Sequence, residues 1–184
     1  MLQVNFDPFP ILTTERLVLR EIKNTDAKDF FVMRSNADTM RYIPRPVAVT
    51  EADVLEVIDR ISTGLKTNES ISWGITLKGE NKFVGSIGFV RMKKENYRAE
   101  IGYILHPDLH GKGIMYEALQ ACIDYGFKTM KLHTIEGIVD ARNIASAKLL
   151  EKSGFIKEGY FKEDTFHNGE FSDSVYYTLF KTKQ

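Results

Sequence analysis

A short turn rich in glycine is the segment of the sequence best suited to chemistry. It consists of His110, Gly111, Lys112, Gly113, Ile114 and Met115, between a strand-like and a helix-like segment. Two glycines let the backbone turn tightly and bring successive N–H groups close to a ligand. The helix that follows adds unpaired N–H groups and the positive end of its dipole, so the turn can bind a phosphate or pyrophosphate. An ordinary strand-to-helix turn is the alternative, and these six residues alone do not decide between the two.

Two well-known phosphate-binding motifs do not fit this turn. The dinucleotide fingerprint requires a third glycine where Tyr116 stands, and a tyrosine there prevents close packing of helix on strand. The P-loop requires Gly-Lys followed directly by Ser or Thr, whereas Gly113 and Ile114 follow Lys112. If the turn binds phosphate, it belongs to neither of these motifs.

A second group of polar residues lies at the start of a short predicted helix downstream. Asn143 can cap this helix and still offer its amide to a ligand, and Ser146 lies one turn further on the same face. Gly154 ends the helix before Phe155. Taken alone, this pattern favours an ordinary capped helix over a ligand site.

The segments around these motifs alternate between strand and helix patterns along the whole chain, which is typical of a mixed α/β protein. Strands are expected at residues 16–22, 71–77, 83–90, 99–106, 133–139, 155–161 and 175–180. Helices are expected after Asp26, after the Thr50–Asp53 capping pattern, from Gly113, and over 145–152. We therefore predict a mostly antiparallel central sheet of about seven strands with helices on both faces, in one domain over residues 1–184 with a core of 14–181.

The composition excludes several classes of protein. The chain has 184 residues, 43% of them hydrophobic, and 25 Lys+Arg balance 25 Asp+Glu. It is therefore not a disordered chain, and it lacks the basic excess that a nucleic-acid or anionic-membrane partner requires. It has neither the start of a secretory signal nor a run of about 18 apolar residues, so a cytoplasmic protein is expected.

Cysteine and histidine give no sign of a disulfide or a metal site. Cys122 is the single cysteine, so an intrachain disulfide is impossible, and its apolar helical surroundings predict a small core residue. The four histidines show no spacing with Cys or carboxylates typical of metal ligands. We expect no metal cofactor.

Taken together, three segments resemble the GNAT superfamily of acyl-CoA-dependent N-acetyltransferases. They are the strand at residues 99–107, the turn from His110 to Met115, and Asn143–Ser146 followed by Gly154-Phe155. Within the superfamily, the chain is similar to the RimJ/RimL type, which includes ribosomal-protein N-terminal acetyltransferases. The resemblance runs from about Thr14 to Lys181, and the joint order and spacing are far more specific than any one motif.

The resemblance implies that acetyl-CoA is the cosubstrate. The family's Gln/Arg-x-x-Gly-x-Gly/Ala loop corresponds to the turn, with His110 first and Met115 last, and its backbone N–H groups hold the CoA pyrophosphate. The strand end at residues 104–106 pairs with the pantetheine arm, a recognition mode led by the backbone. The implied cofactor-binding residues are the six of the turn together with Ile104, Leu105, His106, Asn143 and Ser146.

Transfer to an amine requires loss of a proton from nitrogen. A lysine-like amine, with a pKa near ~10.4, needs a base or a desolvating site, whereas an α-amine at ~7.7–8.0 needs less help. Glu100 is the first candidate base, because it shares a strand face with Gly102 and Ile104 and some superfamily members carry their base on this strand. A structural pairing of Glu100 with Arg98 or Arg91 is the alternative.

Other candidates for the base and the acid stay open. Glu136, Glu163, Asp164 and a water relay are the alternative bases. Many superfamily members carry a tyrosine acid where Leu150 stands, so Ser146 is the expected substitute that hydrogen-bonds or protonates the thiolate. Free thiols titrate near ~8.5, so an acid is useful but not essential. A splayed strand at Ile104-Leu105 can offer an N–H donor to the oxyanion.

The leading hypothesis is an acetyl-CoA-dependent N-acetyltransferase that works by direct transfer in a ternary complex. The resemblance favours a protein N-terminal amine of the ribosomal type as acceptor, with a small amine or an amino-acid-like toxin as alternative. A non-catalytic acyl-CoA sensor is the competing class, and exposed sheet edges allow a homodimer. The family's amine entrance lies between the early helices and the last hairpin, where the candidate lining residues are Arg34, Asn36, Tyr42, Arg45, Phe166 and His167.

Overall fold

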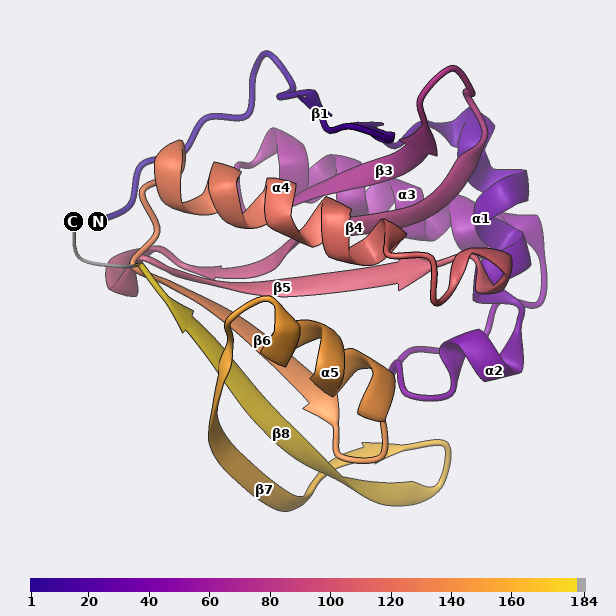
Figure 1. The fold of residues 1–184 in the computed structure, drawn as a ribbon. Helices are drawn as coiled ribbons and strands as arrows, with labels where there is room; N and C mark the ends of the chain where they lie inside the picture. The colour runs from indigo at the N-terminus through magenta and orange to yellow at the C-terminus, as the bar shows by residue number, and fades with distance from the viewer. Residues whose placement is uncertain (182–184) are drawn as a thin grey trace.

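An eight-stranded sheet forms the centre of the computed structural model, which describes residues 1–181 (Figure 1). The strands lie in the order β1-β2-β3-β4-β5-β6-β8-β7. Their bounds are β1 Leu12–Thr13, β2 Leu17–Glu21, β3 Ile71–Leu77, β4 Phe83–Lys93, β5 Arg98–Leu105, β6 Thr134–Asp140, β7 Ile156–His167 and β8 Glu170–Phe180. The mixed α/β prediction is confirmed. The strand beyond the expected seven is β1, a two-residue segment too short to show a period in the sequence.

Helices cover both faces of this sheet, as predicted. Their bounds are α1 Ala27–Arg34, α2 Ala37–Met40, α3 Glu51–Lys66, α4 Ile114–Lys128 and α5 Ile144–Lys152. On one face, α4 and α5 bury Leu119 and Leu150 in a cluster with Trp73 of the sheet. On the other face, α1 and α3 bury Phe30 and Ile58 in a second cluster (Figure 1). Cys122 is fully buried in α4, which confirms it as a core residue.

Two of the three predicted helix caps form, those of α3 and α5. Thr50 caps α3 through its hydroxyl, and the Asp53 carboxylate accepts from the N–H of Thr50 at 2.9 Å. The prediction that Asp26 caps α1 is wrong, because its side chain makes no cap hydrogen bond there. Both Asp26 oxygens instead accept from the Arg20 guanidinium at 2.8 Å, and one also accepts from the N–H of Lys23.

The sheet opens between two adjacent inner strands, β5 and β6. All neighbouring strands are antiparallel except β5 and β6, which run parallel and pair only at Arg98–Thr134, Ala99–Ile135 and Glu100–Glu136. Beyond Glu100, β5 continues to Leu105 along β4, whereas β6 continues along β8. The strands therefore diverge, and one edge of β5 is left open for a further strand-like partner. The predicted splay at Ile104-Leu105 is confirmed.

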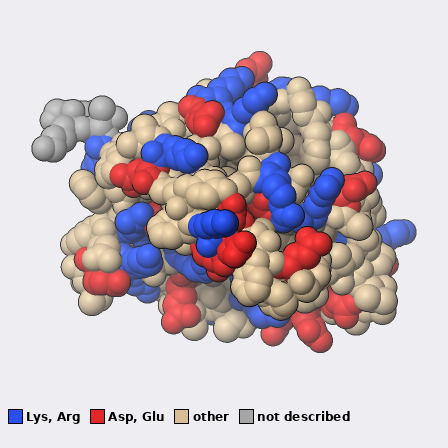
Figure 2. Space-filling model, turned by 90° about the horizontal axis from the view of Figure 1, so that it is seen from below, with Lys and Arg blue, Asp and Glu red and all other residues tan. Residues whose placement is uncertain are grey.

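Charges are mixed over the surface. Figure 2 shows basic and acidic side chains interleaved on the face seen from below. Within residues 1–181, no helix is long and apolar enough to cross a bilayer. The same residues contain no group of three or more His, Cys, Asp or Glu placed to share a metal ion.

Candidate active site

A large open cavity of about 1670 Å³ occupies the divergence of β5 and β6. It extends from the α2–α3 loop and α3, across β4 and β5, to the glycine turn and α5. The predicted site residues that line it are Glu100, Ile104, Leu105, His110, Gly111, Gly113, Ile114, Met115, Asn143 and Ser146. The structure thus brings together residues that are up to 46 positions apart in the sequence, from Glu100 to Ser146.

Two predicted cofactor-binding side chains do not line the cavity. His106 is engaged locally, because its Nδ1 accepts from the N–H of Asp108 at 3.3 Å and its own N–H donates to Val84. Lys112 has an exposed side chain, and its carbonyl accepts from Arg16 at 3.0 Å. The binding argument rests on the backbone N–H groups of the turn and does not need the side chain of Lys112.

The glycine turn has the geometry expected of an anion cradle. Gly111 and Gly113 have φ angles of 72° and 74°, in the left-handed region that other residues adopt only with strain. A Cβ at Gly111 would meet nothing within 4 Å, so there is room beside the backbone. Helix α4 begins at Ile114 without a side-chain cap, which leaves its first N–H groups available. These observations fit a bound pyrophosphate.

The turn is held in place from both sides. The His110 Nε2–H donates to the carbonyl of Leu105 at 3.0 Å, which ties the turn to the end of β5. Arg16 binds the Lys112 carbonyl and also Glu117 of α4, at 2.6 Å from Nε to Oε2. Although burial opposes it, hydrogen bonds from Thr14 and Arg16 lower the pKa of Glu117. The sequence analysis missed Arg16, because its partners lie about a hundred positions away.

The Asn143 and Ser146 pair forms as predicted and gains a third member. The Asn143 Oδ1 accepts from the N–H of Ser146 at 3.1 Å, so this cap leaves the Asn143 amide nitrogen unused. The Ser146 hydroxyl shares a hydrogen bond of 2.5 Å with the hydroxyl of Tyr103 on β5. Burial raises the pKa of Tyr103 to about 12, with the bond to Ser146 acting in the opposite direction. Tyr103 therefore keeps its proton at neutral pH. Nothing in the local sequence indicates this role, because Ser146 lies 43 positions from Tyr103.

Glu100 lies in the same cavity, half-buried on β5. Its carboxylate accepts from Arg91 at 3.0 Å, so the pairing expected as the alternative exists, with Arg91 and not with Arg98. Burial raises the pKa of Glu100, and Glu136 adds to this, whereas Arg91 and Arg45 oppose it. A carboxylate with a raised pKa in a cleft is a candidate proton acceptor.

The alternative carboxylates are placed differently. Glu136 is 6% exposed, forms an ion pair with Arg98, and does not line the cavity. Glu163 also lies outside the cavity lining, whereas Asp164 belongs to it. Tyr176 of β8 also lines the cavity. Burial raises the pKa of Tyr176, and the nearby charges of Asp164 and Glu100 raise it further. The geometry brings Glu100 and Asp164 to the cavity and leaves the other two carboxylates out.

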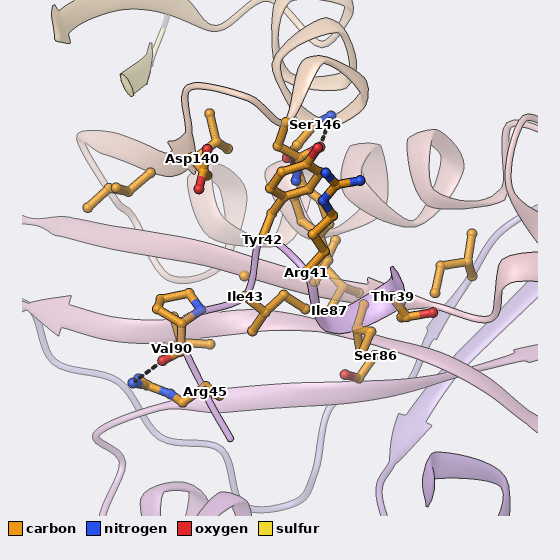
Figure 3. Close-up of a pocket in the computed structure, with 18 of the residues that line it drawn as sticks. Thr39, Arg41, Tyr42, Ile43, Arg45, Ser86, Ile87, Val90, Asp140 and Ser146 are labelled. Carbon is orange, nitrogen blue, oxygen red and sulfur yellow. Dashed lines mark hydrogen bonds between the residues drawn. The ribbon is translucent and has the colours of Figure 1, made fainter. Parts of the chain in front are cut away.

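Four of the six residues expected at the amine entrance line the cavity, namely Arg34, Tyr42, Arg45 and His167. Asn36 does not, because its side chain caps α2 by accepting from the N–H of Thr39 at 2.8 Å. Phe166 is exposed and packs on Phe171 instead. In Figure 3, the side chains of Arg41 and Tyr42 rise from the α2–α3 loop toward the Ser146 end of the cavity.

This combination of a splayed central sheet and a glycine turn is matched by a known family. The family model described as "Acetyltransferase (GNAT) domain" matches residues 16–156. The chain belongs to the GNAT acetyltransferase family. It is therefore an acetyltransferase, as predicted.

Three curated relatives of this GNAT chain carry N-acetyltransferase names. "Uncharacterized N-acetyltransferase YoaA" of Bacillus subtilis is 32% identical over 96% of this chain and 99% of its own length. "Spermidine N(1)-acetyltransferase" of Escherichia coli K12 is 27% identical over 89% of this chain and 85% of its own. "[Ribosomal protein uS5]-alanine N-acetyltransferase" of the same organism is 28% identical over 89% and 87%.

Solved structures show the same fold. A GNAT-family acetyltransferase from Bacillus anthracis has a TM-score of 0.83 and 35% identity, covering 93% of this chain and 98% of the other. RimL, a ribosomal L7/L12 α-N-protein acetyltransferase solved with coenzyme A, has a TM-score of 0.85 with the same coverages. Its identity is 20%, so this likeness shows the fold alone.

Proposed function

We propose that this GNAT protein transfers the acetyl group of acetyl-CoA directly to a primary amine in a ternary complex. One observation carries the proposal: β5 and β6 diverge beside a glycine turn that begins a helix, so a strand-like edge and an anion cradle share one cavity. Acetyl-CoA supplies the acetyl group as a thioester when it is bound. An acyl-enzyme on cysteine has no support, because the one cysteine is buried in α4 and burial raises its pKa.

In this proposal, backbone groups hold most of acetyl-CoA. The N–H groups of the turn, from Gly111 to Met115, bind the pyrophosphate. The open edge of β5 at Ile104 and Leu105 pairs with the pantetheine arm in the manner of an added strand. The free amide nitrogen of Asn143 donates to the same arm, and Ser146 lies beside it.

Glu100 acts as the proton acceptor of the amine. It lies on the α1–α3 side of the sheet, on the face of β5 that it shares with Ile104, and it lines the cavity. Its raised pKa brings its basicity closer to that of an amine, although the ion pair with Arg91 opposes this rise. Asp164 is the second candidate on the same cavity wall.

Tyr103 and Ser146 serve the thiol side. Their hydrogen-bonded hydroxyl pair lies on the α5 side of the sheet, across β5 from Glu100. Because Tyr103 stays protonated, the pair can donate a hydrogen bond to the departing sulfur through Ser146 and so stabilise the thiolate. Acceptor and donor groups on opposite sides of one strand suit direct transfer through the opening in the sheet.

The acceptor is a primary amine, with a protein N-terminus of the RimJ/RimL kind as the first candidate. The relative named for ribosomal protein uS5 supports this candidate. The relative named for spermidine supports a small amine at a similar level of identity. Both readings use the same donor site.

Thiol release tests the proposal. Purified protein is incubated with acetyl-CoA and panels of N-terminal peptides, free amines and amino acids, and free CoA is measured against time. We expect release with at least one class of amine. Tight acetyl-CoA binding with no release for any amine would instead identify a non-catalytic acyl-CoA sensor. Ser146→Ala should slow the release of CoA without weakening the binding of acetyl-CoA, which distinguishes catalysis at this site from binding alone.

A further inference from the structure

Three arginines gather at the acceptor end of the cavity. Arg34 ends α1, Arg45 lies in the α2–α3 loop, and Arg60 lies on α3, and all three line the cavity. We call these residues the arginine cluster. Burial lowers the pKa of Arg34, and the charges of Arg60 and Arg45 lower it further, so each of these two guanidinium groups lies close enough to that of Arg34 to repel it.

The cluster has no acidic partner among residues 1–181. Five other arginines are in ion pairs, namely Arg16, Arg20, Arg91, Arg98 and Arg142, whereas Arg41, which also lines the cavity, lies over the ring of Tyr42. Asp53 and Glu56 also line the cavity, but Asp53 accepts from the N–H groups of Val49 and Thr50, and Glu56 is exposed. Neither carboxylate comes within 4.0 Å of a cluster guanidinium. Arg45 and Arg60 are exposed, so water screens their charges, but the half-buried Arg34 is held among like charges without a counter-ion, at a cost in free energy.

Arg34 also has a buried donor without a partner. Its Nη2 donates to the carbonyl of Pro46 at 3.2 Å, whereas its Nε is buried and makes no hydrogen bond. The hydroxyl of Thr39, which lines the same cavity, is buried and unpartnered as well. Buried donors are almost always satisfied, and one left open points to a missing acceptor. A guanidinium fork matches the two oxygens of a carboxylate or phosphate.

The cluster lies close to the proposed base. The charge of Arg45 is near enough to Glu100 to lower the pKa of that carboxyl, against the larger effect of burial. Arg45 and Val90 of β4, both labelled in Figure 3, line the same cavity, and β4 pairs with the Glu100 segment of β5. An anion at the cluster and an amine at Glu100 can therefore belong to one acceptor molecule.

We propose that the arginine cluster binds a carboxylate or phosphate of the acceptor, so that the substrate is an amine that also carries an anionic group. This inference rests on the proposed acetyl transfer and names the substrate class. Acceptors of this class are small amino acids, phosphoamines, and peptides that have Asp or Glu near their N-terminus. A polyamine, which carries only positive charge, is disfavoured by the same arginines.

Matched pairs of amines test the substrate class. O-phosphoethanolamine is compared with ethanolamine, γ-aminobutyrate with butylamine, and peptides bearing Asp or Glu at positions two and three with their Asn or Gln counterparts. We expect kcat/KM to be about 10-fold to 100-fold higher for the anionic member of at least one pair, the size expected for charge-assisted hydrogen bonds. Preference in the small-molecule pairs alone, or in the peptide pairs alone, identifies the source.

Variants test the residues. Arg60→Gln should raise KM for the anionic member and leave both the neutral member and the affinity for acetyl-CoA unchanged. Arg34→Gln should raise this KM more strongly. Because Arg34 also donates to the carbonyl of Pro46, its replacement can disturb the α2–α3 loop, whereas replacement of the exposed Arg60 does not. Lys66→Gln, an exposed change of charge on the same helix, is the matched control and should have no effect.

The two proposals fail separately. If neutral amines are turned over as well as their anionic counterparts, the proposed anion site at the arginine cluster is wrong, whereas the proposed acetyl transfer is supported. Where no amine is turned over, acetyl transfer is contradicted, and calorimetry with O-phosphoethanolamine decides on the cluster: binding that Arg60→Gln abolishes supports it, and no binding overturns it.

Discussion

At the level of single residues, the site depends on ionisable groups whose surroundings differ across one strand. Glu100 is half-buried beside Arg91, and Tyr103 is hydrogen-bonded to Ser146. Burial raises the pKa of both, with opposite consequences: Glu100 becomes a better proton acceptor and Tyr103 a group that stays protonated. These two states are what transfer from a thioester to an amine requires.

Replacing Glu100 with Gln should lower kcat/KM by about 10²–10⁴-fold, the usual contribution of a general base. The wild-type rate should fall as the pH is lowered through the Glu100 pKa, since the base must be deprotonated to act, and this limb should lie above the usual carboxyl range. The measurement is kcat/KM against pH with a lysine-type acceptor. Asp164→Asn is the comparison: if it removes the acidic limb and Glu100→Gln does not, Asp164 is the base.

Tyr103→Phe and Ser146→Ala should each lower kcat by about 10-fold, less than the loss at Glu100, because a CoA thiolate is already a stable leaving group. The affinity for acetyl-CoA should stay the same, which calorimetry checks. Because the two hydroxyls act through one hydrogen bond, the double variant should lose no more than either single one. Additive losses would mean that the hydroxyls act independently.

At the level of elements, the glycine turn and the start of α4 were predictable from local sequence. Turn residues and a helical period are encoded within a dozen positions, and so is the Asn143 cap. The hairpin was less predictable. β7 and β8 extend to His167 and from Glu170, whereas strands were expected only at 155–161 and 175–180. Exposed residues on both faces of β7 erase the alternation on which a strand prediction depends.

Contacts between distant elements account for the rest. The Tyr103–Ser146 bond joins residues 43 positions apart, and the Arg16–Glu117 ion pair joins residues 101 apart. Arg34 and Arg45 were expected at the amine entrance only through the family resemblance. Which arginines of the described residues form ion pairs can be recognised only from the folded structure. Sequence patterns carry local geometry, whereas the pairing state of a charge depends on the whole fold.

Gly111→Ala should raise the Kd for acetyl-CoA by about 10-fold or more, because the new Cβ points into the room beside the turn and the φ of 72° strains it. Gly79→Ala is the matched control. Gly79 also has a positive φ, of 83°, and nothing within 4 Å of a Cβ, but it lies in the β3–β4 turn away from the cavity. Both variants should lose about 1–2 kcal/mol of stability. Equal Kd values for the two would show that the turn does not contact the ligand.

At the level of the whole molecule, we expect a chain with no net charge to recognise anions through local groups. The 25 basic and 25 acidic residues cancel, and both kinds are interleaved on the face in Figure 2. The two proposed anion sites are therefore different in kind. One uses backbone N–H groups at a helix start, and the other uses an arginine cluster that has no acidic partner in the part of the chain that the structure describes.

The opening in the sheet should also make the stability of the fold depend on ligand binding. Strands β1 to β5 and strands β6 to β8 meet in the sheet through only three residue pairs between β5 and β6. A ligand that pairs with the open edge of β5 and contacts α5 bridges the two sides of the opening, and it can do so only in the folded state. At about 100 times its Kd, acetyl-CoA should therefore stabilise the fold by about 2.7 kcal/mol.

For a chain of this length, that stabilisation corresponds to a rise in Tm of about 5–10 °C, which a thermal melt with increasing acetyl-CoA measures. Gly111→Ala should need a higher concentration for the same rise, whereas Gly79→Ala should follow the wild-type curve from a lower starting Tm. Hydrogen exchange locates the effect: amides at the end of β5, residues 101–105, should be protected by the ligand, and those of the β7–β8 turn at Asn168-Gly169 should not. Protection confined to the hairpin, with β5 unchanged, would place the cosubstrate outside the opening and contradict the proposed pose.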